Sequence, residues 1–356
     1  SPLPFPADAE FALIGRAMPG ERRPEGPFGD HYGYYSLVHD YPVFRVEAVA
    51  RREDPLYPAT VVGKPRQEDF HIGEYLQDLL SPLFPVVMPA VRDIRSYGET
   101  GFHSLTAAVV HQRYKREAVA AAFRILGEGQ LSLTKFLLVL DRPRDLKDFR
   151  GVLADVLRRA DFRTDLYVFG NLAMDSLDYA GPRIDEGSKG VLLGVGDPVR
   201  DLPESFRGPL PAGVTEARVF CPGCLVLQGP PFPGSVSRGR AAADVAPILA
   251  HPALEGWPLV VITDDAARAT RSVINFLWTT FTRFEPAADL HGRDVTLVRS
   301  HPSFTPPVAI DARMKPWYPE ELFCDPETAR KVERRWKDYF PAGGVEMGDS
   351  NRAHLD

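Results

Sequence analysis

Two carboxylates stand five positions apart in a short stretch rich in proline, glycine and tyrosine. Glu25 and Asp30 belong to the segment "PEGPFGDHYGYY" (24–35), and the four residues between them are Gly, Pro, Phe and Gly. Such a turn is tight and has low conformational entropy, so it can direct both side chains into one space. Two carboxylates in a dry pocket push their pKa values apart, and one then stays protonated as a general acid. The alternative is an ordinary Pro/Gly turn whose acids face water.

His31 follows Asp30 directly and precedes a tyrosine-rich stretch. An imidazole titrates near neutral pH, so His31 could tune the carboxylate pair. A histidine beside Tyr32 and Tyr34 is more often a hydrogen-bonded wall residue of a pocket. We therefore place His31 in the expected substrate pocket.

Lys135 follows Thr134 and immediately precedes the apolar run "FLLVLD". The edge of an α/β layer commonly binds phosphate groups, and lysine is a good point-charge partner for them. Lys135 is therefore a candidate cofactor-binding residue. The alternative is a solvated surface lysine.

The segment "GSKG" (187–190) is predicted to be a turn of small residues that would let the backbone approach a ligand. Ser188 and Lys189 are therefore candidate substrate-pocket residues. The segment is not a P-loop, because the required glycine-lysine spacing and a following helix are absent. A plain turn here would need no function.

Cys221 and Cys224 form a single CxxC pair. A structural zinc site needs four ligands, and neither a second such pair nor an HxxxH pattern follows. Two ordinary cysteines of a strand-turn-strand are the better interpretation, so we predict no metal site from these residues. The motifs of serine hydrolases, zinc proteases and nucleotide dehydrogenases are also absent.

The composition is that of a globular protein. The chain has 356 residues, 44% hydrophobic and 25% charged, enough for two or three packed units. The net charge is −6 and basic residues are scattered among acidic ones, so nucleic acid is a poor candidate for a partner. No run approaches the ~20 apolar residues of a membrane span. Three cysteines and the lack of a signal peptide make the reducing cytoplasm the expected location.

Hydrophobic periodicity divides the chain into a β-rich start and two α/β units. Residues 1–66 alternate apolar and polar side chains, which predicts part of a barrel or an antiparallel sheet. Residues 67–82 carry apolar side chains on one helical face, which predicts a linker helix. Strands then alternate with helices over 83–200 and 201–340, and residues 341–356 are expected to be a flexible tail. The strands expected in the first part are "AEFALIGRAM" (9–18), "YPVFRVEAVARRED" (41–54) and "DPLYPATVVG" (54–63).

The two α/β units follow the same order of elements. Corresponding residues recur at a spacing of about 123 to 124 positions, which is the signature of an internal repeat. The matching pairs are Asp141 and Asp264 after a strand, Arg159 and Arg283 at the end of a helix, and Asp165 and Asp289 before the next strand. The sequence therefore predicts a duplicated unit.

Several long motifs, in the same order along the chain, resemble the UbiD-type decarboxylases, which use prenylated FMN. The motifs are "PEGPFGDHYGYY" (24–35), "YPVFRV" (41–46), "REDPLYPATVVGKPRQED" (52–69), "TKFLLVLD" (134–141) and "WTTFTRFEP" (278–286). The resemblance implies an α/β fold, α+β overall. It would comprise the C-terminal part of a flavin-binding split β-barrel, a linker helix and a duplicated α/β oligomerisation unit.

The resemblance also implies roles for residues. Glu25 would belong to an Arg-Glu-Glu/Asp network, Asp30 would donate a proton to the carbon that loses CO2, and Lys135 would contact the cofactor phosphate. The reaction would be a non-oxidative decarboxylation of an aromatic acid, hydroxylated and perhaps polyprenylated, in ubiquinone or menaquinone biosynthesis. The alternative is a non-catalytic oligomerisation module that retains the fold.

Other parts of the family pattern are missing from this chain. Family members carry a longer N-terminal region with the network's arginine and with the Asn, His and Glu that bind a divalent metal. Mn²⁺ or Mg²⁺, with K⁺, is therefore expected only together with that region. The resemblance further implies a homodimer or hexamer and a flavin prenyltransferase of the UbiX type as cofactor supplier. A polyprenylated substrate would bring the protein to a membrane surface without a membrane span.

Overall fold

The computed structural model describes residues 4–57, 62, 64, 67–322 and 325–344. The described strands are β1 (Phe11–Glu25), β2 (His39–Arg51), β3 (Val91–Ser96), β4 (Leu105–Val110), β5 (Phe136–Leu140), β6 (Leu166–Ala173), β7 (Glu186–Gly194), β8 (Glu216–Cys221), β9 (Cys224–Gln228), β10 (Leu259–Thr263), β11 (Leu290–Val298) and β12 (His301–Asp311). The described α-helices are α1 (Glu68–Leu80), α2 (Phe84–Val87), α3 (Glu117–Leu126), α4 (Phe149–Arg159), α5 (Val245–Leu249), α6 (Ala266–Thr270), α7 (Val273–Thr282), α8 (Pro286–Asp289) and α9 (Pro326–Tyr339).

Two five-stranded sheets share one topology. The strand order is β3-β4-β5-β7-β6 in the first sheet and β8-β9-β10-β12-β11 in the second. In each sheet the three inner strands are parallel to one another and the two edge strands are antiparallel to their neighbours. The central strands β5 and β10 are buried along their whole length, as strands covered on both faces should be. This common topology confirms the predicted duplication.

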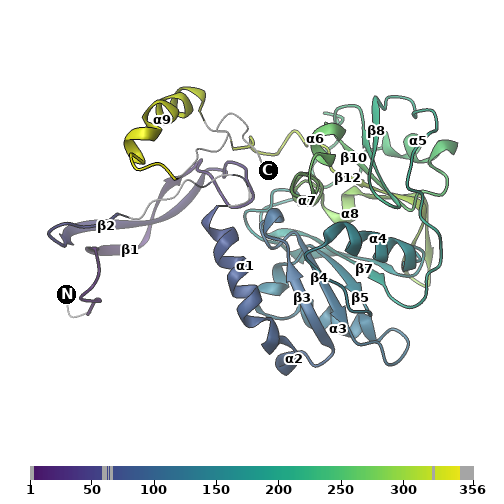
Figure 1. Cartoon of the computed structure of the whole chain (residues 1–356), viewed down its shortest axis with the longest axis horizontal. Helices are drawn as coiled ribbons and strands as arrows, with labels where there is room; N and C mark the ends of the chain where they lie inside the picture. The colour runs from purple at the N-terminus through teal and green to yellow at the C-terminus, as the bar shows by residue number, and fades with distance from the viewer. Residues whose placement is uncertain (1–3, 58–61, 63, 65–66, 323–324, 345–356) are drawn as a thin grey trace.

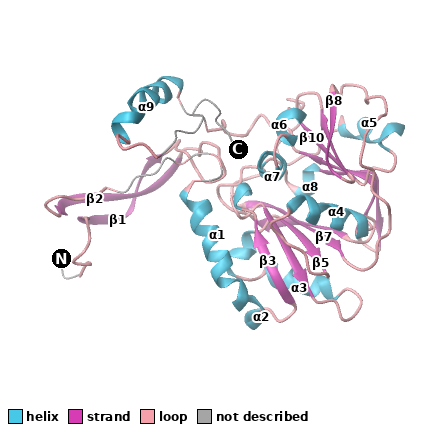
Figure 2. Ribbon diagram, viewed as in Figure 1, coloured by secondary structure: helices cyan, strands magenta, loops and turns pink. Residues whose placement is uncertain are grey.

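The two sheets share a hydrophobic core. α4 and α7 lie between the sheets, and their phenylalanines join both units in one buried cluster (Figure 2). The ring of Phe220 from β8 stacks on Phe276 of α7 at 3.6 Å, and Phe149 of α4 lies 6.1 Å from Phe276. Aromatic pairs at these separations add to the free energy of burial. The two units therefore pack against each other through a common core.

The first part of the chain is less buried. β1 and β2 form a long antiparallel ribbon that extends away from the sheets, with α9 beside it (Figure 1). Apolar side chains on this ribbon are exposed, for example Leu13 at 60% and Val49 at 58%. α1 is the helix expected near residues 67–82, yet none of its residues is buried and its apolar Tyr75 is 67% exposed. Half of the residues of the strand expected at 54–63 lie outside the described residues, and the described ones, 54–57 and 62, are not in a strand. Most of the expected tail also lies outside the described residues.

The predicted turn at 187–190 is wrong, because these residues belong to the buried strand β7. The small residues are needed for packing and not for a bend. A Cβ added to Gly190 would lie 2.4 Å from the ring of Phe136, and one added to Gly187 would lie 1.6 Å from the sulfur of Met174. Glycine within a strand often marks such a close approach by a neighbour.

No helix in the described part of the chain is long and apolar enough to cross a membrane.

Candidate functional site

Asp30 is a buried carboxyl group with one unused oxygen. Asp30 is only 4% exposed, and its Oδ1 accepts a hydrogen bond of 2.8 Å from the backbone N–H of Tyr32. Oδ2 is buried without a hydrogen-bond partner among the described residues. Burial raises the pKa of Asp30 to about 7, and the nearby charges of Asp175 and Asp178 add to the effect. The group is therefore suited to hold a proton near neutral pH.

The edge of the first sheet gathers further ionisable side chains around Asp30. His103 precedes β4, Lys135 precedes β5, and Asp175 and Asp178 follow β6. Because β6 is antiparallel to β7, its end lies at the same edge as the starts of β4, β5 and β7. Ligands of open α/β sheets usually bind at the opposite edge, outside the carboxyl ends of the parallel strands. Strand order alone would therefore have directed attention to the edge opposite this group of side chains.

His31 and His103 converge on Asp175. Asp175 Oδ2 is hydrogen-bonded to Nδ1 of His103 and lies 3.8 Å from Nε2 of His31, while Oδ1 accepts a bond of 2.9 Å from Leu177 N–H. Burial opposes the charge of Asp175, but these hydrogen bonds outweigh it and hold the pKa below the usual range. Burial lowers the pKa of His31, so its imidazole is neutral at neutral pH. His31 is a half-buried wall residue of the site.

Two buried lysines lie within the electrostatic influence of one carboxylate, Asp178, at the same edge. Lys135 Nζ lies 2.6 Å from Asp178 Oδ2, and both side chains are at most 2% exposed. Lys189 Nζ donates a hydrogen bond of 2.9 Å to the carbonyl of Thr134, and burial lowers its pKa to about 8. When both amines are charged, the cluster holds one positive charge that Asp178 does not neutralise. Within the described part of the chain, Lys135 Nζ also has no hydrogen bond of good geometry, which suits an anionic ligand.

Ser188 and Glu25 lie apart from these groups. Ser188 is fully buried, and its Oγ accepts a hydrogen bond of 2.8 Å from Ala287 N–H at the start of α8, so it joins the two units. Glu25 is the last residue of β1 and is exposed, opposite His39. Among the described residues no hydrogen bond or ion pair joins Glu25 to Asp30. Their joint action stays a prediction.

The second unit anchors the loop that carries Asp30, a feature that the sequence analysis missed. Tyr34 is 1% exposed, and its ring stacks on Trp278 of α7 at 5.2 Å. The hydroxyl of Tyr34 is hydrogen-bonded to Thr282 Oγ1 at 2.9 Å and accepts a bond of 3.1 Å from Arg283 Nε. Trp278 Nε1 in turn donates a bond of 2.8 Å to the carbonyl of Tyr32. The loop backbone is therefore held two residues from the acid.

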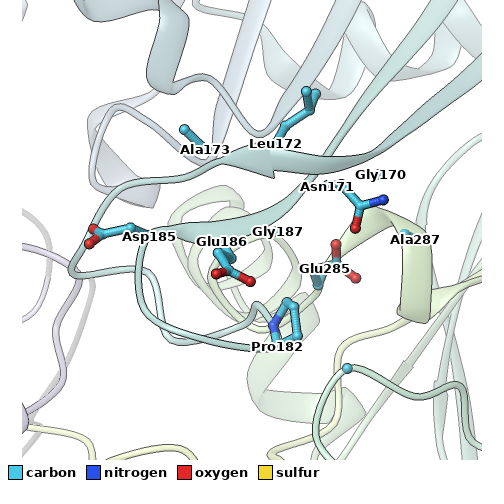
Figure 3. A pocket seen from close by; sticks show the side chains of 11 residues that line it. Gly170, Asn171, Leu172, Ala173, Pro182, Asp185, Glu186, Gly187, Glu285 and Ala287 are labelled. Atoms are coloured by element: carbon cyan, nitrogen blue, oxygen red, sulfur yellow. The ribbon is translucent and has the colours of Figure 1, made fainter.

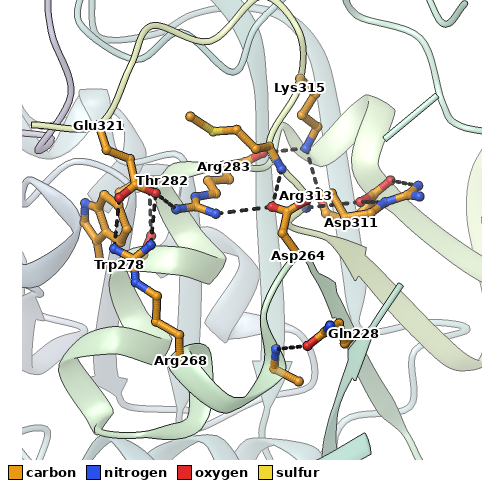
Figure 4. A network of polar contacts seen from close by, with 12 residues as sticks. Gln228, Asp264, Arg268, Trp278, Thr282, Arg283, Asp311, Arg313, Lys315 and Glu321 are labelled. Atoms are coloured by element: carbon orange, nitrogen blue, oxygen red, sulfur yellow. Dashed lines mark hydrogen bonds and ion pairs between the residues drawn. The ribbon is translucent and has the colours of Figure 1, made fainter. Parts of the chain in front are cut away.

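Glu321 ties this anchor to the C-terminal part of the second unit (Figure 4). Its carboxylate accepts hydrogen bonds from Arg283 at 2.6 Å, from Arg268 at 2.9 Å and from Lys64 at 2.9 Å. Burial opposes ionisation, but the three cations outweigh it and hold the pKa of Glu321 at about 2. Flanking backbone bonds run from Tyr35 N–H to the carbonyl of residue 320 and from the N–H of residue 322 to the carbonyl of residue 33. A search for short sequence motifs could not find this network, because two of its members, Lys64 and Glu321, lie 257 positions apart.

Gly33→Ala is expected to destabilise the protein more than Gly20→Ala. Both glycines have positive φ, +84° and +78°, where a side chain costs about 1–2 kcal/mol. A Cβ at Gly33 would also lie 2.9 Å from Nε1 of Trp278, whereas nothing lies within 4 Å at Gly20. Overpacking adds about 1–3 kcal/mol, so thermal unfolding should show the larger fall in Tm for Gly33→Ala. Equal shifts would mean that the contact with Trp278 does not constrain the loop.

A separate hollow of about 410 Å³ lies between the β6–β7 end and α8 (Figure 3). The described residues that line it include the acidic Asp185, Glu186 and Glu285 and no basic side chain. An anionic substrate would be repelled there. None of the candidate site residues lines this hollow, so it is not the site described above.

These observations define a class: an α/β protein with a buried carboxyl group, whose pKa is raised, and two buried lysines at one edge of its first sheet. The model of the "3-octaprenyl-4-hydroxybenzoate carboxy-lyase Rift-related domain" matches residues 1–65, and that of the corresponding C-terminal domain matches residues 70–194. Together the two domains account for more than half of the chain. The chain belongs to the UbiD family.

Relatives extend the match to almost the whole chain. A protein of Chlamydia pneumoniae that is named as a subunit of 4-hydroxybenzoate decarboxylase is 50% identical over 340 residues, which is 96% of this chain and 57% of that protein. An uncharacterised protein of Chlamydia trachomatis is 50% identical over 338 residues, 95% of this chain and 57% of its own length. The chain thus spans little more than half the length of these relatives.

A solved structure shares the fold. The vanillic acid decarboxylase of Sedimentibacter hydroxybenzoicus, in its closed form, is 23% identical and aligns with a TM-score of 0.50. The alignment covers 58% of this chain and 43% of that one. The mixed α/β fold expected from the sequence is therefore confirmed.

Proposed function

We propose that this chain is the proton-donating part of a decarboxylase that removes CO2 from a hydroxylated aromatic acid. The observation that carries the proposal is Asp30, a carboxyl group that is 4% exposed and whose Oδ2 has no partner in the described part of the protein. A buried acid with one oxygen left without a partner is costly for stability, and such groups occur where function needs them. The family membership supports the same reaction class.

Asp30 supplies the proton that replaces the lost carboxylate. When the bond between the ring and the carboxylate breaks, CO2 leaves and the electron pair stays on the ring carbon. The proton of Asp30 then moves to that carbon, which leaves Asp30 as a carboxylate that water must reprotonate. The anchor formed by Tyr34 and Trp278 fixes the distance over which this proton moves. Glu25 is proposed to act with Asp30 as the charged member of the network, and His31 to line the substrate pocket.

The buried lysines fit a phosphorylated cofactor. Prenylated FMN, when bound, supplies the electron sink for the carbon that loses CO2. Lys135 has no well-formed hydrogen bond to a described residue, and with Lys189 it leaves one buried positive charge unneutralised, which a phosphate would balance. We propose Lys135 as the phosphate contact and Lys189 as its neighbour, with Ser188 keeping α8 in place. A divalent metal and K⁺ are proposed to bind with residues outside this chain.

The substrate class and partners follow from the same proposal. A hydroxyaryl acid is favoured by the names of relatives, one called a subunit of 4-hydroxybenzoate decarboxylase and one a vanillic acid decarboxylase. A role in quinone biosynthesis, a homo-oligomeric state, a flavin prenyltransferase as supplier and a cytoplasmic location are proposed with it. We further propose that the domains of this chain meet near residues 66, 82, 200 and 340.

The test is CO2 release by the complete gene product that contains this chain. Loaded with prenylated FMN, it is expected to release CO2 from 4-hydroxybenzoate or vanillate and to catalyse deuterium exchange at the same carbon in D2O. A preparation that binds the cofactor but releases no CO2 from either acid, or from a polyprenylated analogue, would favour the alternative of a non-catalytic oligomerisation module.

A further inference from the structure

Three side chains from three separate segments meet beside Asp30. His31 follows the acid loop, His103 precedes β4, and Asp175 follows β6. One ligand atom from each lies within 4.8 Å of the other two. All three residues are half-buried or less exposed, and no ion is present in the structure. The decarboxylase proposal assigns no bound ion to this cluster.

The carboxylate is fixed in place for two imidazoles at once. Asp175 Oδ2 is hydrogen-bonded to His103 Nδ1 and lies 3.8 Å from His31 Nε2. Its other oxygen is held by the N–H of Leu177 at 2.9 Å, so the carboxylate cannot easily turn away. Preorganised ligands of this kind lower the cost of binding a metal ion, because their orientation is set before the ion arrives.

A small cavity and a negative field adjoin the cluster. The cavity, about 10 Å³ in volume, is lined by His31, Asp69 and Phe102 among others. That is close to the smallest space that holds one water molecule. Asp69 and Asp175 both act on the charge of His31, and Asp178 is already paired with Lys135. The surroundings therefore favour a cation with one water ligand.

We propose that His31 Nε2, His103 Nδ1 and Asp175 Oδ2 bind a Zn²⁺ ion, with a water molecule from the adjacent cavity as fourth ligand. Zn²⁺ prefers four ligands in a tetrahedron, and two histidines with one carboxylate plus water form a common open set. The ion takes the place of the proton on His103 Nδ1, and the neutral ring keeps its single N–H on Nε2. Its three ligands are not the Asn, His and Glu that the family resemblance places in an N-terminal region.

Zn²⁺ titration of the complete gene product, freed of metal by a chelator, tests this site without any turnover. Calorimetry should find one more Zn²⁺ bound per chain in the wild type than in His103→Gln, or else a Zn²⁺ affinity that is at least ~100-fold weaker in the variant. Removing a residue that only hydrogen-bonds to a metal ligand weakens metal affinity by about 10–100-fold, and removing a ligand itself should weaken it more. Co²⁺ should give a visible absorption band that His103→Gln and Asp175→Asn lack. His111→Gln is the matched control, because the His111 imidazole lies outside the cluster and accepts a hydrogen bond from Arg92.

Equal stoichiometry and affinity in the wild type and in both cluster variants would overturn the proposal. His31→Gln provides a second ligand variant if His103→Gln fails to keep the wild-type circular dichroism spectrum. Binding by all variants alike would mean that Zn²⁺ sits elsewhere, and absence of binding would leave the cluster as a hydrogen-bonded pair. Because neither substrate nor prenylated FMN is used, failure here leaves the decarboxylase proposal standing.

Discussion

Asp30→Asn is expected to lower the kcat of decarboxylation by about 10²–10⁴-fold and to change the KM for the acid much less. The amide keeps the shape of the side chain and the hydrogen bond from Tyr32 N–H, but it has no proton to give to the ring carbon. Steady-state CO2 release by the complete, cofactor-loaded gene product measures the effect. Asp197→Asn, at a side chain that is 94% exposed, is the matched control and should behave as the wild type.

The same variant should not lose stability. Asp30 Oδ2 is buried without a partner among the described residues, so its carboxyl group adds little to the folding free energy and an amide replaces it at low cost. An unchanged or higher Tm together with a large loss of kcat would separate function from folding. Turnover within about threefold of the wild type, far short of the loss expected for a missing general acid, would remove Asp30 from the role of proton donor.

The parts of the fold that repeat a simple period were predictable from the sequence. Buried strands such as β5 and β10 appear in the sequence as short apolar runs. Amphipathic helices such as α4 are recognised because their apolar residues recur with a period of 3.6. The spacing between Asp141 and Asp264 indicated the duplication, which the common strand order confirms. These features depend on hydrophobic periodicity and on internal duplication, and a single sequence displays both.

Two strands escaped this reasoning because of proline and glycine. β12 contains Pro306 and Pro307, which argue against an inner strand. In the structure these prolines lie at a register shift opposite Gly292 and Asp294, and the pairing with β10 begins only at Val308. The ladder therefore does not need their missing N–H groups. β7 was mistaken for a turn because its glycines signal bending, whereas they admit neighbouring side chains.

The candidate site was only partly predictable. Asp30 stood out through its spacing from Glu25, but its burial depends on partners that lie far away along the chain, such as Trp278. His103 and Asp175 carry no motif, and they meet only because β6 runs antiparallel to β7 and ends at the edge where β4 and β5 begin. Long-range pairing of this kind leaves no local periodicity in the sequence.

Glu321→Gln is expected to destabilise the protein by roughly 3–5 kcal/mol at pH 7, because it leaves Arg283 and its neighbouring cations without their shared anion. The Glu321 side chain is only 12% exposed, so water compensates little for the loss. Urea unfolding followed by tryptophan fluorescence measures the change, since Trp278 lies against the network at 4.8 Å from the Arg283 guanidinium. Glu255→Gln, at an exposed position, is the control and should change the free energy of unfolding by less than about 0.5 kcal/mol.

The loss should also depend on pH with a definite sign. The pKa of Glu321 is about 2 in the folded protein and ordinarily 4.5, so folding favours its ionised form. Its contribution is therefore complete above about pH 4.5 and is lost as the pH falls toward 2, and this difference corresponds to roughly 3 kcal/mol. The gap in stability between the wild type and Glu321→Gln should then narrow steadily from about pH 5 to about pH 2.5. A gap of constant size over this range would mean that Arg268, Arg283 and Lys64 do not act on Glu321 through its charge.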